Sequence, residues 1–144
     1  MTPRSLFCES LSEAERHKYI ESEKARRDLG PEAIEDWQRR FWTQWLRHRW
    51  VEHLMGDVCW EEFDDWRLGR LPALFGGHAG LLGEVIELVR RGGENADIVW
   101  WAATGKRDIG TVVRMLTELR LNEIRCCRGC LDFVGLAVEE ALAP

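Results

Sequence analysis

The feature that most constrains the fold is the long segment between Gly30 and Gly56, which holds four of the chain's eight tryptophans. Proline is common at the first position of a helix and glycine just past its end. Pro31 and Gly56 therefore predict one long helix from about Pro31 to Met55. The tryptophans of this segment are Trp37, Trp42, Trp45 and Trp50.

This predicted helix is apolar around well over half of its circumference. At roughly 100° per residue, Ile34, Trp37, Phe41, Trp45 and Met55 share one arc. The neighbouring arc holds Trp42, Leu46, Trp50 and Leu54. A helix at the surface of a domain needs an apolar stripe of only about 100°. The helix therefore either runs through the middle of the domain or offers its second face to a partner.

A first helix precedes it and completes an antiparallel hairpin over about residues 10–56. Ser10 with Glu13, and Ser12 with Glu15, both have the spacing of a capping box, so the helix is predicted to begin at one of these serines. Gly30 is predicted to end it, and the chain reverses at the joint with Pro31.

The remainder is predicted to be helical as well. An acidic connector and a glycine-rich loop occupy about residues 57–80, with a short helical turn or isolated strand near Trp60, and further helices follow over about 81–142. Asp108 is the predicted N-cap of a helix that reaches about Cys127. The fold class is all-α, an irregular helical domain spanning residues 1–144, built on the hairpin and its Trp-rich second helix.

Charge and cysteine content restrict the functional classes. The net charge of −5 argues against a general nucleic-acid binder, which normally carries a basic excess. No stretch has the roughly 20 apolar residues of a membrane span, and the first ten residues lack the apolar core of a secretion signal. Five cysteines are an odd number without an export signal, so reduced thiols and a cytoplasmic location are expected.

One set of residues has the spacing of a metal or acid–base site. Glu13 and His17 lie one turn apart on the first helix, as His48 and Glu52 do on the second, and folding the hairpin sets Glu13 opposite His48. Facing helices hold metals in this way in helical bundles, although the Glu-x-x-His motif of di-iron proteins is absent. The alternative, which the frequency of such pairs favours, is that all four make ordinary hydrogen bonds and ion pairs.

A second candidate set is Cys126, Cys127 and Cys130. With a histidine such as His78, three thiolates can form a zinc site. A single Cys-x-x-Cys pair is a weak signal, and buried structural thiols are the favoured interpretation. No cofactor is therefore expected, with a transition metal as the alternative.

The third set combines Trp42, Arg47, Arg49 and Trp50. Tryptophan and arginine are enriched at protein-binding hot spots, and they also contact single-stranded nucleic acid. A self-contained core with arginines paired to acidic residues explains the same pattern. Signatures of nucleotide-binding loops, nucleophile elbows and zinc proteases are absent. The sequence favours a non-catalytic interaction protein that binds a protein partner or a copy of itself, with metal binding and then single-stranded nucleic acid as alternatives.

Overall fold

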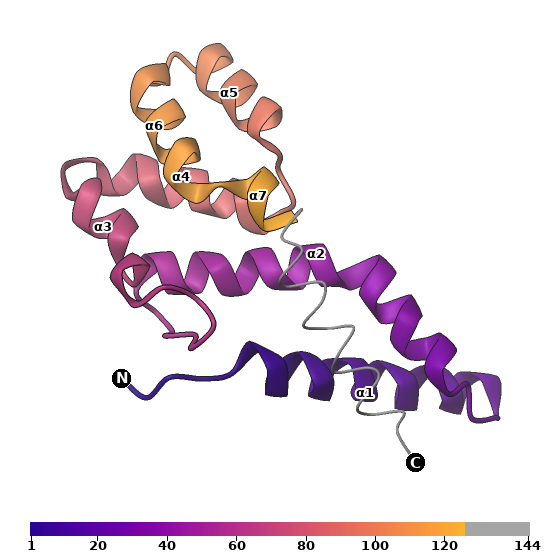
Figure 1. Ribbon diagram of the computed structural model, residues 1–144. Coiled ribbons are helices and arrows are strands. Elements are labelled where there is room, and N and C mark those ends of the chain that lie inside the picture. The colour runs from indigo at the N-terminus through magenta and orange to yellow at the C-terminus, as the bar shows by residue number, and fades with distance from the viewer. Residues whose placement is uncertain (126–144) are drawn as a thin grey trace.

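The computed structural model describes residues 1–125, and every regular element within them is helical (Figure 1). The all-α fold class is confirmed. In chain order the elements are α1 (Leu6–Ala25), α2 (Pro31–Met55), the 3-10 turn η1 (Asp65–Arg67), α3 (Arg70–Leu74), the 3-10 turn η2 (Gly76–His78), α4 (Ala79–Arg90), α5 (Asn95–Thr104), α6 (Ile109–Leu119) and α7 (Leu121–Arg125).

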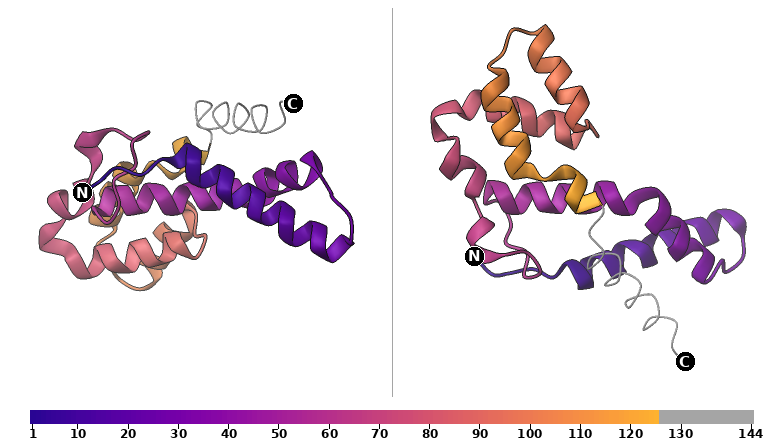
Figure 2. Two further views of the ribbon diagram at one scale, coloured as in Figure 1. Left: turned by 90° about the horizontal axis from the view of Figure 1, so that it is seen from below. Right: turned by 45° about the horizontal axis from the view of Figure 1, so that its top comes forward.

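Helix α2 runs through the middle of the structure. Helix α1 packs along one side of it, while α3, α4 and α7 pack on the other (Figures 1 and 2). Two clusters of buried side chains result. One joins Trp50, Val51 and Leu54 to α3–α7, and the other joins Ile34, Trp37, Trp42 and Leu46 to α1 and Trp60. The apolar width of α2 is thus explained by burial on two sides within one chain.

Helix α1 begins earlier than the capping-box spacing predicts. Its N-cap is Ser5, whose hydroxyl accepts a hydrogen bond from the Cys8 N–H at 3.2 Å. The hydroxyls of Ser10 and Ser12 instead donate to the carbonyls of Phe7 and Cys8 within the helix. The prediction of a start at Ser10 or Ser12 is therefore wrong, because both serines bond back to the preceding turn, an alternative open to serine inside helices.

A distant carboxylate completes this N-terminus. The Glu62 side chain accepts hydrogen bonds from the Leu6 N–H at 2.7 Å, the Phe7 N–H at 3.1 Å and the Ser5 hydroxyl at 3.0 Å. Helix N-termini expose unpaired N–H groups and favour negative charge. The acidic connector therefore stabilises the start of α1, and an isolated parallel bridge between Arg4 and Trp60 fixes the two segments together.

The joint between α1 and α2 is longer than predicted. Helix α1 ends at Ala25, with Arg26 in the left-handed conformation at φ 56°, and Gly30 becomes the N-cap of α2 at φ 60°. The Leu29 N–H donates to the Ser22 hydroxyl and the Gly30 N–H to the Asp28 carboxylate. These local bonds hold a turn over residues 26–30 where continuous helix was predicted.

Two further boundaries differ from prediction. The glycine-rich loop, predicted as the second part of the segment over about 57–80, contains α3 and η2. The helix predicted from Asp108 to Cys127 breaks at Arg120, which has φ 51°, and resumes as α7. The Asp108 cap itself is confirmed, since its carboxylate accepts a hydrogen bond from the Thr111 N–H at 3.2 Å.

Candidate functional site

Trp42 and Trp50 lie in the core and not at the surface. Each is only 3% exposed. The Trp50 indole N–H donates to the Leu119 carbonyl at 2.6 Å, and the Trp42 ring stacks on Trp45 with centroids 5.6 Å apart. The expectation that these two rings meet a partner is therefore overturned, because α3–α7 and α1 already cover both faces of α2.

The arginines between them are also engaged within the chain. Arg47 is buried and forms two parallel hydrogen bonds to the Glu94 carboxylate, both of 2.9 Å. Arg49 pairs with Glu52 at 3.0 Å and lies over the Trp45 ring. The four predicted interaction residues therefore do not form an exposed basic and aromatic platform for nucleic acid.

The surface with the strongest binding features lies between α1 and α2, and we call it the hairpin groove. It consists of two adjoining hollows of about 220 and 270 Å³. Glu13, Trp37 and Phe41 line both, so they mark the middle of the groove. The remaining lining residues are Arg16, His17 and Ile20 on α1 and Gln44, Trp45, His48 and Arg49 on α2.

The groove has an aromatic floor and an exposed apolar rim. Trp37 is 4% exposed and meets Trp45 edge to face, with ring centroids 6.0 Å apart. Phe41 stands above this floor and is 40% exposed, as is Ile20 across the groove. Large apolar side chains that remain partly exposed to solvent beside a buried aromatic cluster are typical of protein-binding surfaces.

One end of the groove is held by a charged cluster. His17 of α1 lies 2.8 Å from the Asp36 carboxylate of α2, which also accepts hydrogen bonds from Arg40 at 3.1 Å and Arg39 at 3.3 Å. The bond to His17 is the main reason that the pKa of Asp36 lies below its ordinary value, with the two arginines adding to the effect. The His17 ring also contacts Phe41 edge-on at 5.5 Å, so this cluster positions the phenylalanine.

The predicted pairing of Glu13 with His48 is partly realised. Both line the same hollow. The four predicted metal ligands do not converge, however. His17 is bonded to Asp36, and Glu52 accepts the Trp60 indole N–H at 3.2 Å. His48 lies 3.0 Å from the Arg90 carbonyl oxygen. Within residues 1–125 no group of three or more His, Cys, Asp and Glu side chains is arranged to hold a metal ion.

Two rim charges of the groove have no ionic partner in the described part of the chain. Glu13 and Arg16 lie one turn apart on α1, and neither forms an ion pair or side-chain hydrogen bond there. Other ion pairs are satisfied around them, including His17 with Asp36 and Arg49 with Glu52. The groove thus combines open apolar side chains with two opposite charges left for an incoming group.

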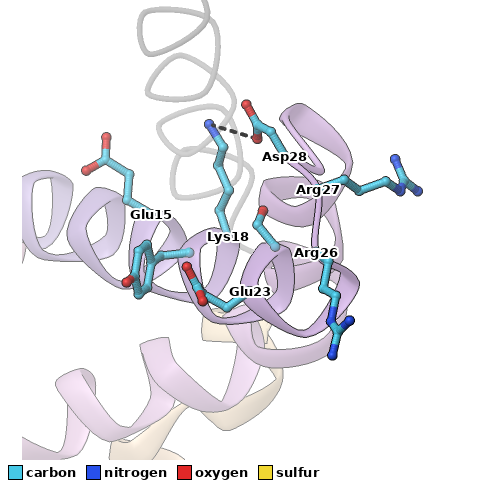
Figure 3. Close-up of a pocket in the computed structure, with 8 residues that line it drawn as sticks. Glu15, Lys18, Glu23, Arg26, Arg27 and Asp28 are labelled. Carbon is cyan, nitrogen blue, oxygen red and sulfur yellow. Dashed lines mark ion pairs between the residues drawn. The ribbon is translucent and has the colours of Figure 1, made fainter.

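A second hollow, larger than either part of the hairpin groove, lies elsewhere and has a different character. It measures about 600 Å³ and is lined by α1 and the turn after it (Figure 3). Lys18 and Asp28 approach to 3.9 Å, while Glu15, Arg26 and Arg27 extend outward in Figure 3. Charges of both signs on exposed side chains, with Tyr19 as the one aromatic group, give it no defined ligand chemistry.

Sequence reasoning missed the tryptophans that are exposed. Trp66 is 59% and Trp100 is 72% exposed. The guanidinium groups of Arg67 and Arg70 lie over the Trp66 ring at 4.2 and 4.9 Å. The sequence contains a weak indication of this exposure. Trp66 lies outside any predicted helix. Trp100 is followed directly by Trp101, and of these two neighbours only Trp101 packs against the core.

The cysteines divide between described and undescribed parts of the chain. Cys8 is exposed and Cys59 is buried, and both are free thiols. The candidate site of Cys126, Cys127 and Cys130 lies outside the described residues, as does the last part of the helical region predicted over about 81–142.

In residues 1–125 no helix combines the length and apolar character needed to cross a membrane. Comparisons of the chain with protein families, with characterised proteins and with solved structures find no match.

Proposed function

We propose that the protein is a non-catalytic helical interaction module whose binding surface is the hairpin groove. The observation that carries the proposal is the exposure of Phe41 and Ile20 beside the buried Trp37 floor. Hot spots of protein interfaces consist of aromatic anchors in pockets that exclude water. An apolar side chain seated between Phe41 and Ile20 would cover both residues and contact the aromatic cluster beneath.

The fold supports this role because it holds the groove rigidly. The floor belongs to α2, which is packed on both sides, and the His17–Asp36 contact fixes α1 beside Phe41. A preformed surface lowers the ordering cost of association. A cytoplasmic location is part of the proposal, supported by the free thiols of Cys8 and Cys59.

Site-specific photo-crosslinking tests the proposal. A photoreactive amino acid is placed at position 20 or 41 in the full chain and, as a matched control, at Ile109 on α6, which is 43% exposed. We expect discrete protein adducts from positions 20 and 41, none from 109, and competition by unlabelled wild type but not by Phe41→Asp. Equal labelling from all three positions, or no adduct from the groove, would contradict the proposal.

A further inference from the structure

Two opposite charges at the rim of the hairpin groove are placed so that they can pair with the same two side chains of a second copy of the chain. Glu13 and Arg16 lie side by side on α1 with opposite charge, and neither has an ionic partner within residues 1–125. A two-fold axis that passes between two such residues brings each one opposite its complement on the other copy. Two ion pairs between Glu13 of one copy and Arg16 of the other would then form, one on each side of the axis.

The shape of the groove is also complementary to a second copy of the same surface. Phe41 rises between the two hollows and lines both, so each copy carries a protruding ring and recesses beside it. A two-fold interface requires a surface that complements itself, with projections and recesses on the same patch. An axis near Phe41 would let the ring of each copy enter a recess of the other and would cover Ile20, which is 40% exposed.

We infer that the hairpin groove is a homodimer interface in which Glu13 of each copy pairs with Arg16 of the other around the two Phe41 rings. This rests on the proposed function and deepens it, because it names the partner as a second copy of the chain. The apolar contacts supply most of the affinity, and the two symmetric ion pairs set the orientation.

Charge reversal tests the pairing directly by sedimentation velocity on the full chain over about 1 µM to 1 mM, which covers weak self-association. The wild type is expected to dimerise. Glu13→Arg sets two arginines against each other across the axis, and Arg16→Glu sets two glutamates against each other. Each single variant should therefore weaken dimerisation on the order of tenfold. The double variant restores opposite charges and should recover the wild-type dimer.

Mixing the two single variants gives the sharpest test. One copy then carries two arginines and the other two glutamates, so both cross-pairs become attractive and a heterodimer should form where neither variant dimerises well alone. Glu15→Arg makes the same change of net charge on the exposed side of α1 and should leave the dimer unaffected. None of these positions makes an internal ion pair in the described residues, and matching circular dichroism would verify an intact fold.

Different outcomes would overturn the homodimer and the interaction role of the hairpin groove. A wild type that stays monomeric throughout, or a dimer indifferent to both reversals and to their combination, would overturn the homodimer. If the wild type is monomeric while positions 20 and 41 still crosslink to a different protein, the groove binds a heterologous partner and the proposed function stands. A monomer without groove crosslinks would overturn both.

Discussion

The guanidinium of Arg47 and the carboxylate of Glu94 face each other with two hydrogen bonds of 2.9 Å, although the arginine side chain is 2% exposed. Glu94 is also the N-cap of α5, where its side chain and that of Asp97 form a capping box. The pair thus joins the centre of α2 to the start of α5. Arg47 has the only buried guanidinium in the described residues. Removing Glu94 should therefore change the free energy of unfolding by a different amount from removing Arg47.

Glu94→Gln should destabilise the protein more than Arg47→Met. The glutamine variant keeps the size and an acceptor for the helix cap but leaves a buried positive charge unpaired. Breaking a fully buried pair costs about 3–5 kcal/mol, and since the Glu94 side chain is 42% exposed we expect roughly 2 kcal/mol. Arg47→Met removes the charge together with its desolvation cost. Urea unfolding of both variants measures the difference, and a larger loss in Arg47→Met would contradict this account.

Trp50→Phe and Trp42→Phe should differ, although both rings are 3% exposed. Both substitutions reduce the ring, but within residues 1–125 only Trp50 of these two donates its indole N–H to a carbonyl, that of Leu119 at the end of α6. A buried acceptor without a donor costs about 1–3 kcal/mol, so Trp50→Phe should be less stable than Trp42→Phe by that amount. Thermal unfolding followed by circular dichroism reports the difference, and equal midpoints would argue against the role given to this bond.

The sequence was sufficient for features encoded locally. Gly56 ends α2 at φ 80°, as its position after the apolar run predicts, and Asp108 caps α6. Both signals depend on backbone groups only a few residues away. The relative register of Glu13 and His48 also followed from helix geometry, because both line one hollow.

Features that depend on contacts between segments far apart in the sequence could not be predicted in the same way. The start of α1 depends on Glu62, which approaches from the connector, and the wide apolar surface of α2 fits a buried helix as well as an interface. Only the packing of α3–α7 decides that Trp50 is covered. Phe41, which shares an arc with the buried Trp37, is left 40% exposed because α1 covers that arc incompletely.

His53→Leu should destabilise the connector between α2 and α3. The ring is fully buried, its Nδ1 accepts the Trp60 N–H at 3.1 Å, and its Nε2 lies 2.9 Å from the Asp64 carbonyl oxygen. A backbone N–H can only donate and a carbonyl can only accept, so the ring is neutral with the proton on Nε2. Leucine leaves the buried Trp60 N–H without an acceptor, at a cost of about 1–3 kcal/mol, whereas the Asp64 carbonyl keeps the hydrogen bond that it accepts from the Arg67 N–H at 3.1 Å.

Nitrogen NMR and a matched variant check this assignment. Long-range proton–nitrogen spectra should report Nε2 as the protonated nitrogen of His53. His78→Leu, which changes an exposed histidine, should alter the free energy of unfolding by less than about 0.5 kcal/mol. An Nδ1-protonated ring, or equal effects of the two substitutions, would refute the proposed hydrogen bonding.

The contact between His17 and Asp36 makes the stability of the hairpin sensitive to acid. The pKa of Asp36 in the folded protein lies below its ordinary value of 3.8, chiefly because of the bond to His17 and then those to Arg40 and Arg39. The unfolded chain therefore binds a proton at higher pH than the folded chain does. The stabilisation is present above pH 3.8 and is lost as the pH falls through the folded pKa.

Asp36→Asn should make the free energy of unfolding less dependent on pH in the acid range. The wild type is expected to lose stability more steeply than the variant as the pH falls below 3.8, and the two curves should converge once Asp36 is protonated in both states. Asp65→Asn, at an exposed carboxylate, serves as the control and should follow the wild-type slope. Urea midpoints measured at closely spaced pH values give the slopes. Parallel curves for wild type and Asp36→Asn would mean that the cluster beside Phe41 does not hold the hairpin together.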